Sequence, residues 1–202
     1  MEVQGPAGAL ELKLDDPPSP DGRIAVLCHP HPQYGGNMDD GVLQCLTDTL
    51  VGVGVGCLRF NFRGVGRSEG SYGAGAGELD DLCAVIDWLN STRPARSLWL
   101  GGYSFGANIA WRGLARGIDA ERVLLLAPPI GNMDFAELDS CKVDVFAGDA
   151  DQYIDHKLLD AFVASTQITL HLLVGADHFF SGQWDILTTT IEDSLTGWTS
   201  DI

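Results

Sequence analysis

The sequence predicts an α/β fold in which a mostly parallel central sheet carries helices on both faces. Short, continuous apolar runs such as residues 23–28 recur along the chain, and such runs are typical of strands buried on both faces. Segments with apolar residues at helical spacing separate these runs. Strands that alternate with helices in this way indicate a parallel sheet.

The first predicted strand, residues 9–14, alternates apolar and polar side chains and is therefore expected to be half-buried. A turn rich in aspartate and proline follows it over residues 15–22. Further along, the glycines of residues 52–56 precede a strand, whereas a phosphate-binding loop would follow one, so we interpret them as a plain connection. The continuous apolar runs predict strands over residues 23–28, 56–60, 98–101, 123–127, 143–147 and 170–174.

Helices are expected between these strands. In the first, Val42, Leu43, Leu46 and Leu50 lie at helical spacing. In open parallel sheets, ligands bind outside the carboxyl ends of the strands, so reactive residues are expected directly after the apolar runs. The predicted helices span residues 38–51, 78–90, 105–116, 155–165 and 184–198.

Length and charge limit the classes of function. The 202 residues suit a single domain over residues 1–202. With 28 acidic and 12 basic side chains the net charge is −16, which disfavours nucleic acid and anionic membranes as partners. The N-terminus lacks the basic and apolar regions of a secretory signal, and no apolar run has the ~18 residues of a membrane span. We expect a cytoplasmic protein. An exposed edge strand near the N-terminus offers a pairing site for a second copy of the chain, so a homodimer is a candidate assembly.

The cysteines argue against a disulfide framework and against a zinc site. Their number is odd, their spacings are wide and no Cys-x-x-Cys pair occurs. Reduced, buried thiols in a cytoplasm are therefore expected. The five are Cys28, Cys45, Cys57, Cys83 and Cys141.

One serine stands in the pattern Gly-x-Ser-x-Gly, in which Ser104 is flanked by Gly102 and Gly106. The pattern lies between a predicted strand and a predicted helix. A sharp turn at such a junction presents the serine hydroxyl at the top of the sheet. A hydroxyl is a weak nucleophile, however, and needs an adjacent base.

His178 is the best candidate for that base, because it follows the last predicted strand. His171 lies inside that strand, His156 begins a predicted helix, and His29 and His31 belong to another loop. Metal binding by these last two is disfavoured, because no carboxylate-rich partner is evident. A rigid, hydrogen-bonded loop is expected there, and no metal or other cofactor.

A histidine base needs a carboxylate to fix its tautomer. Asp149 and Asp151 both lie in the loop after the strand at residues 143–147. Asp151 is preferred, with Asp149 as the alternative, while Asp177 is expected to be structural. The resulting order of Ser104, Asp151 and His178 is the order found in α/β-hydrolases.

Acyl transfer also requires N–H groups that stabilise an oxyanion. The Phe105 N–H, directly after the serine, is one predicted donor. The second is expected from the loop after residues 23–28. Since Pro30 and Pro32 have no N–H, either Gln33 or Tyr34 is the candidate.

The chain resembles the α/β-hydrolase superfamily from Leu10 to its C-terminal helix. The segments His-Pro-His-Pro-Gln-Tyr-Gly-Gly-Asn-Met-Asp (residues 29–39) and Asn-Phe-Arg-Gly-Val-Gly-Arg-Ser-Glu-Gly (residues 61–70) resemble a group of small bacterial hydrolases. The resemblance implies a catalytic triad at Ser104, Asp151 and His178. In the second segment, a structural role is expected for Arg63, Gly64, Gly66 and Ser68.

Many members of the superfamily carry a lid, and the resemblance implies that it would lie within residues 127–142. This segment is too short for such a cap domain. The expected function is therefore hydrolysis of small carboxylic esters at an open site. Thioesterase or peptidase activity with the same triad, and a non-catalytic binding protein, are the alternatives. The substrate is expected to contact aromatic side chains: Tyr34, Tyr103, Phe135, Tyr153, Phe179 and Phe180.

Overall fold

A computed structural model of the protein describes residues 1–136, 138, 142–165 and 168–196. Its strands are β1 (Glu2–Gly5), β2 (Gly8–Asp15), β3 (Arg23–Cys28), β4 (Gly56–Phe60), β5 (Ser97–Tyr103), β6 (Arg122–Leu126), β7 (Lys142–Gly148) and β8 (Ile168–Leu173). Its helices are α1 (Gly41–Gly52), α2 (Ala76–Thr92), α3 (Phe105–Ala115), α4 (His156–Ser165) and α5 (Trp184–Leu195), with a short 3-10 helix η1 at Pro32–Tyr34.

Within the described residues, eight strands form one sheet in the order β1-β2-β4-β3-β5-β6-β7-β8. The pairs β1–β2 and β2–β4 are antiparallel, and every other neighbouring pair is parallel. The predicted α/β class and the mostly parallel sheet are thus confirmed. Because β3, β5, β6, β7 and β8 run in one direction, the loops that follow them meet at one edge of the sheet.

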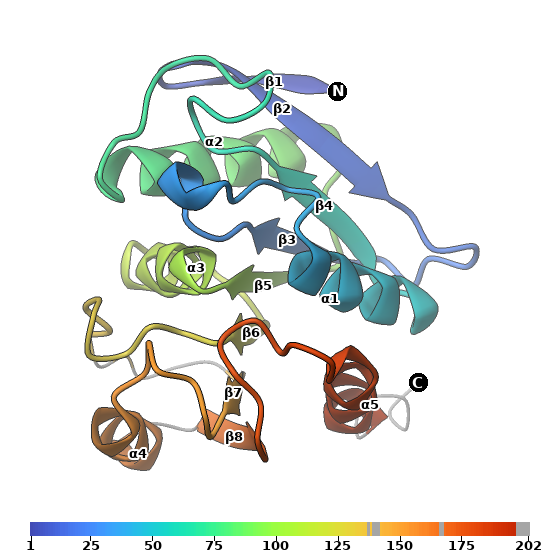
Figure 1. Ribbon diagram of the computed structural model, residues 1–202. Coiled ribbons are helices and arrows are strands. Elements are labelled where there is room, and N and C mark those ends of the chain that lie inside the picture. The colour runs from blue at the N-terminus through green and yellow to red at the C-terminus, as the bar shows by residue number, and fades with distance from the viewer. Residues whose placement is uncertain (137, 139–141, 166–167, 197–202) are drawn as a thin grey trace.

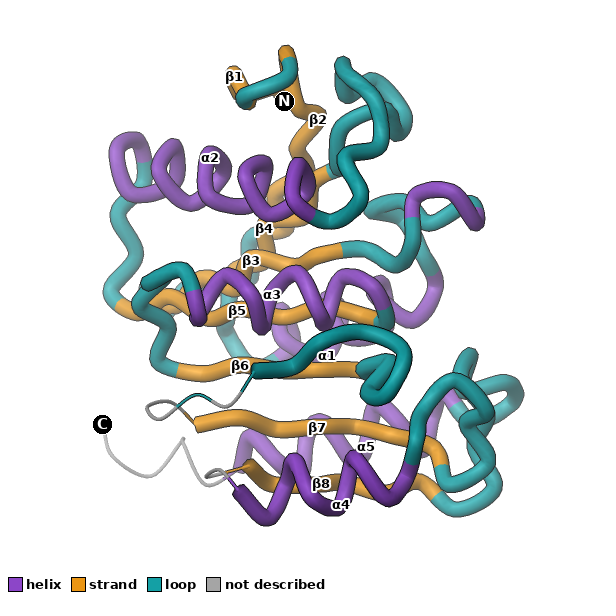
Figure 2. Tube along the Cα trace, turned by 90° about the vertical axis from the view of Figure 1, so that its left-hand side faces the viewer, coloured by secondary structure: helices purple, strands orange, loops and turns teal. Residues whose placement is uncertain are grey.

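Helices cover both faces of the sheet. Helices α1 and α5 lie on one face, and α2, α3 and α4 lie on the other (Figures 1 and 2). Successive residues of β3 accordingly belong to different cores. Ala25 and Leu27 pack with the side chains of α1 and α5, whereas Val26 and Cys28 pack with those of α2 and α3. Burial on both faces explains why this strand is continuously apolar.

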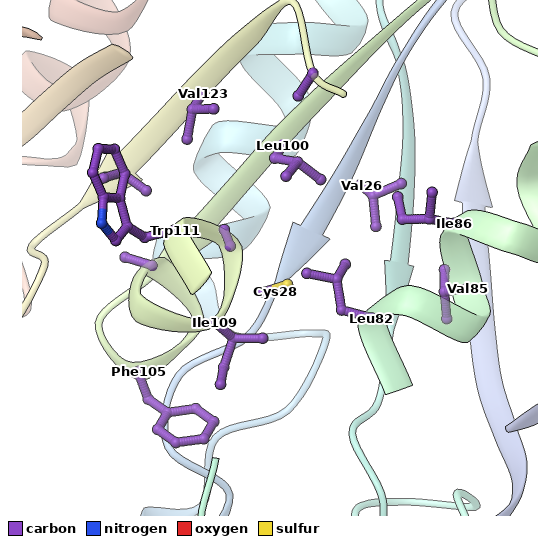
Figure 3. Packing of buried hydrophobic residues seen from close by; sticks show 14 of the residues in the cluster. Val26, Cys28, Leu82, Val85, Ile86, Leu100, Phe105, Ile109, Trp111 and Val123 are labelled. Carbon is purple, nitrogen blue, oxygen red and sulfur yellow. The ribbon is translucent and has the colours of Figure 1, made fainter. Parts of the chain in front are cut away.

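Figure 3 shows the larger core between the sheet and helices α2 and α3. Val26, Leu100 and Val123 come from three adjacent strands and face Leu82 and Ile109 of the two helices. All five side chains are fully buried. Each such aliphatic side chain contributes roughly 1.5–3 kcal/mol through its burial, so this core holds α3, and the turn before it, firmly against the sheet.

The element boundaries differ from prediction by a few residues, and one strand was not predicted. Helix α1 begins at Gly41 rather than at residue 38, because the Asp40 carboxylate caps it and accepts hydrogen bonds from the backbone N–H groups of Val42 and Leu43. Strand β1 pairs with β2 as a hairpin and is too short to show a clear alternation. The expected end of α5 at residue 198 lies outside the described residues.

The loop after β4 has the structural role that was predicted for it. Arg63 forms a salt bridge with the buried Asp81 of α2. The Ser68 hydroxyl donates to the Asn61 carbonyl and accepts from the Glu11 N–H. These contacts join the loop to α2 and to β2. No residue of this loop lines the cavity at Ser104 that is described below.

Among the described cysteines, Cys28, Cys45, Cys57 and Cys83 are free thiols, and Cys141 lies outside the described residues. In the part of the chain that the structure covers, we find no helix with the length and hydropathy needed to cross a bilayer.

Candidate active site

Ser104 sits in a strained turn between β5 and α3. Its backbone angles are φ 54° and ψ −116°, a region that residues other than glycine rarely adopt. The Ser104 N–H donates to the Leu126 carbonyl at the end of β6, at 2.9 Å. The buried Phe105 begins the helix directly after it. The strand before the turn and the helix after it thus hold the serine in place, as the Gly-x-Ser-x-Gly pattern predicted.

The two glycines of the pattern are required by close backbone packing. A Cβ atom on Gly106 would lie 2.1 Å from the Cys28 carbonyl oxygen, at the end of β3. A Cβ atom on Gly102 would lie 2.3 Å from the Gly106 backbone. Real Cβ atoms do not approach so closely, so larger residues would push the turn away from β3.

Ser104, His178 and Asp151 form a continuous chain of hydrogen bonds. The distance from Ser104 Oγ to His178 Nε2 is 2.9 Å, and that from His178 Nδ1 to Asp151 Oδ2 is 2.7 Å. His178 is 6% exposed and Asp151 is 2% exposed. A carboxylate can only accept, so His178 Nδ1 carries the proton and Nε2 is free to accept from the serine hydroxyl. Residues that are 74 positions apart in the sequence are thereby in contact.

Close contact between two loops brings the carboxylate to the histidine. A Cβ atom on Gly148 would lie 2.0 Å from the Ala176 carbonyl oxygen, so the backbone at the end of β7 is in close contact with the loop after β8. The Ala150 N–H donates to the same carbonyl at 3.1 Å. On the other side, the Tyr103 hydroxyl donates to the His178 carbonyl at 3.1 Å. The second oxygen of Asp151 accepts from the Tyr153 N–H at 2.8 Å.

The remaining candidates have other partners. Asp149 is exposed and accepts from the Gly175 N–H. The Asp177 carboxylate accepts from the N–H groups of Phe179 and Ser181, and the bond from Ser181 holds the pKa of this carboxyl below its usual value. His171 lies within β8 and pairs with Asp144. These contacts agree with the preference for Asp151 and with a structural role for Asp177.

The loop from residue 29 to residue 36 is hydrogen-bonded, as predicted. The His29 ring is buried, its Nδ1 lies 2.7 Å from the Pro30 carbonyl oxygen, and its Nε2 accepts from the Phe62 N–H. Burial lowers the pKa of His29 to about 4. The His31 ring packs at tilted angles against the rings of Tyr34, Tyr72 and Phe105. Among the described residues, no group of three or more His, Cys, Asp or Glu side chains is placed to hold a metal ion.

The N–H groups of Gln33 and Tyr34, the two expected candidates for the second oxyanion donor, already donate hydrogen bonds within the loop. The Gln33 N–H donates to His31 Nδ1 at 3.2 Å, and the Tyr34 N–H donates to the His31 carbonyl at 3.0 Å, because these residues form η1. By contrast, the backbone N–H groups of His31 and Phe105 donate no hydrogen bond within the described chain. His31 lies between two prolines and carries the one backbone N–H among residues 30–32, so the sequence alone offered it as a candidate donor.

Ser104 and His178 open into a cavity of about 770 Å³. Of the six predicted wall residues, Tyr34, Tyr103, Tyr153 and Phe179 line it. The prediction missed contributions from the loops before α1 and after β6. The other lining residues are Pro30, His31, Gly35, Gly36, Asp40, Phe105, Pro129, Asn132 and Met133. Residues 127–136 and 138, in the connection from β6 to β7, contain no helix, so no helical lid is formed by the described part of this connection.

Phe135 and Phe180 do not line the cavity, contrary to prediction. Phe135 packs against Trp111 and Phe162, because the connection after β6 runs back over α3 and accepts a hydrogen bond from the Trp111 indole. Phe180 is fully buried with the side chains of α1 and α5. The turn that Asp177 stabilises directs Phe179 outward and Phe180 inward.

Comparisons with known proteins agree with this fold. The family described as alpha/beta hydrolase fold matches residues 26–153. An uncharacterised protein of Rickettsia prowazekii (strain Madrid E) is 36% identical to this chain, in a match that covers 95% of this chain and 86% of that protein.

Solved structures of other proteins share this fold. An alpha-beta serine hydrolase homologue from Coxiella burnetii has a TM-score of 0.91 and 34% identity, and the match covers 97% of this chain and 96% of that one. A serine hydrolase without a lid from Xanthomonas campestris has a TM-score of 0.91 and 33% identity, with 98% and 93% covered. The chain belongs to the α/β-hydrolase family.

Proposed function

We propose that the protein hydrolyses small carboxylic esters through an acyl-enzyme formed on Ser104. The observation that carries the proposal is the hydrogen-bonded chain from Ser104 Oγ through His178 to Asp151, in which Ser104 and His178 line a cavity. In the first step Ser104 Oγ attacks the ester carbonyl carbon while His178 Nε2 takes its proton. Asp151 keeps the imidazole in the required tautomer and stabilises its positive charge.

The N–H groups of Phe105 and His31 are the proposed oxyanion donors. Phe105 is the first residue of α3, where backbone N–H groups have no partner within the helix. Both residues line the cavity beside Ser104. Two such donors stabilise the negative charge that develops on the carbonyl oxygen. The intermediate then collapses, and the alcohol leaves with the proton from His178.

Water completes the reaction. His178 takes a proton from the water, the hydroxide attacks the acyl carbon, and Ser104 leaves with that proton. No cofactor is required by these steps. The cavity volume supports substrates in the size range of small ligands, and the lack of a helix in the described part of the β6–β7 connection supports access for soluble esters.

Hydrolysis of p-nitrophenyl acetate tests the proposal. Ser104→Ala is expected to reduce kcat by about a thousandfold or more, because the nucleophile is lost. Ser91→Ala serves as the matched control, since Ser91 is an exposed serine of α2. Equal rates for wild type and Ser104→Ala would contradict the proposal.

A panel of matched acetyl donors then defines the class of bond. We expect the ester to be cleaved with a higher kcat/KM than the corresponding thioester and anilide. A preference for the thioester or the anilide would instead identify a thioesterase or an amidase with the same triad. Complete inactivity of the folded protein on all three would favour a binding protein.

A further inference from the structure

One carboxylate lines the candidate active site without taking part in the triad. Asp40 precedes α1 and is partly buried. Its Oδ1 atom accepts from the N–H groups of Val42 and Leu43, at 2.9 Å and 3.2 Å. Within the described residues its Oδ2 atom accepts no hydrogen bond, although the side chain borders the cavity. The helix therefore fixes the position of this carboxylate and leaves one oxygen for a ligand.

The environment of Asp40 makes its charge costly. Burial raises the pKa of this carboxyl, and only the two N–H groups of the helix act against that effect. A cation placed against Oδ2 would supply the missing stabilisation. Among the described residues that line the cavity there is no lysine or arginine, and Asp40 is the sole carboxylate.

Three exposed aromatic rings lie around the same cavity. Tyr34 is 87% exposed, Tyr153 is 45% exposed and Phe179 is 52% exposed. Exposed rings of this kind attract cations to their faces. The net charge of −16 acts in the same direction, because it raises the local concentration of positively charged ligands.

Asp40 lines the same cavity as Ser104, His178 and Tyr103. Burial, and after it the charge of Asp40, raises the pKa of Tyr103. The hydroxyl of Tyr103 donates to the His178 carbonyl, and its ring lies 5.6 Å from the His178 ring. We expect one small molecule to place its cation at Asp40 and its ester bond at Ser104, because both residues line one cavity of about 770 Å³.

We infer that Asp40 and the three exposed rings form a subsite for an organic cation, so that the preferred substrates are esters bearing an ammonium group. This inference rests on the proposed esterase function. A hard divalent cation fits the site poorly, since such ions take several oxygen ligands and the described lining offers one carboxylate. An ammonium group matches both the single carboxylate and the aromatic faces.

Matched pairs of esters test the subsite. One pair is acetylcholine and the isostere in which carbon replaces the nitrogen. The other is the ethyl ester of trimethylammoniobutyric acid and its carbon isostere, which moves the charge to the acyl side. For at least one pair, wild type is expected to show a kcat/KM about tenfold higher for the cationic ester. In Asp40→Asn this ratio should fall to about threefold or less, because only the attraction to the rings remains.

Asp40→Asn is informative because asparagine caps helices about as well as aspartate, so the variant removes charge and preserves the cap. The matched control is Asp39→Asn, which removes the same charge one residue away, at a side chain that does not line the cavity. It should keep the wild-type ratio. A second measurement needs no variant: choline should competitively inhibit hydrolysis of p-nitrophenyl acetate by wild type at lower concentrations than its carbon isostere does.

The possible failures can be told apart. If neutral esters are hydrolysed but neither pair shows a preference for the cation, the subsite does not exist and the esterase function stands. A preference that is undiminished in Asp40→Asn would also overturn the assignment to Asp40. If no ester of either charge is hydrolysed, the proposed function itself fails and the inference fails with it.

Discussion

Asp149 and Asp151 are two residues apart in one loop but have different partners. Asp151 is buried against His178, whereas Asp149 is exposed and accepts from the Gly175 N–H. Asp151→Asn is expected to lower kcat for p-nitrophenyl acetate by about three to four powers of ten, because the imidazole would lose the carboxylate that selects its tautomer. Asp149→Asn, the matched control, should change kcat by less than about threefold. Similar losses in both variants would contradict the assignment.

His29 couples folding to pH. Its pKa is about 4 in the folded protein, compared with 6.5 for an ordinary histidine. Below about pH 6.5 the unfolded chain therefore binds a proton that the folded protein does not, and acid favours unfolding down to about pH 4. The total effect is on the order of 3 kcal/mol. Above pH 6.5 both states are neutral at His29, and the residue contributes no pH dependence.

His29→Gln removes this titration. Urea denaturation of both proteins from about pH 7 to about pH 4.5 measures the effect. As the pH falls, the free energy of unfolding should decrease more steeply for wild type than for the variant, so the difference between the two shrinks. A constant difference across this range would show that His29 keeps an ordinary pKa in the folded protein.

The hydrogen-bonded chain of the candidate triad was more predictable than the groups around it. Ser104, Asp151 and His178 each follow a strand, so the sheet topology alone places them near one another. The proposed second oxyanion donor, His31, was not among the predicted candidates because the hydrogen bonds of η1, which occupy the N–H groups of Gln33 and Tyr34, are not visible in the sequence. Phe135 was misplaced because the path of the β6–β7 connection over α3 depends on tertiary contacts.

At the scale of elements, the turn between β5 and α3 is set by contact with β3. Gly106→Ala is expected to destabilise the protein by about 2–4 kcal/mol, because its Cβ would meet the Cys28 carbonyl and neither backbone can move freely. Gly52→Ala is a matched control at the end of α1, where a Cβ would meet nothing within 4 Å. That change should be neutral or stabilising by up to about 1 kcal/mol.

Chemical denaturation of both glycine variants checks this comparison. If Gly106→Ala unfolded at the same denaturant concentration as wild type, the packing of α3 against the end of β3 would be looser than described here. A large loss for Gly52→Ala would imply an unrecognised contact at the end of α1.

The type and order of most elements followed from the sequence, because burial on both faces leaves strands with continuous apolar runs. The first and last residues of each helix and strand were predicted less accurately from the sequence. Helix α1 begins where the Asp40 side chain accepts from two backbone N–H groups, and apolar spacing does not locate that cap. Strand β1 has only four residues, and its place in the sheet comes from pairing with β2.

For the whole molecule, the dominant electrostatic feature is the excess of 28 acidic over 12 basic side chains. Self-repulsion among like charges destabilises a compact state, and salt screens it. Tm should therefore rise by a few degrees between about 0.01 M and about 0.5 M NaCl at pH 7. Differential scanning fluorimetry measures this shift. A fall in Tm with salt would mean that attractive ion pairs at the surface, such as Arg93–Asp16, outweigh the repulsion.

The central claim concerns the whole arrangement, because a strained turn and a loop 74 residues further along must together activate one hydroxyl. A fluorophosphonate probe, followed by trypsin digestion and mass spectrometry, tests it most directly. We predict a single adduct on the peptide spanning residues 97–112, at Ser104, in wild type, and none in Ser104→Ala or His178→Ala. An adduct at another residue, or esterase activity in a protein whose Ser104 remains unlabelled, would contradict the account.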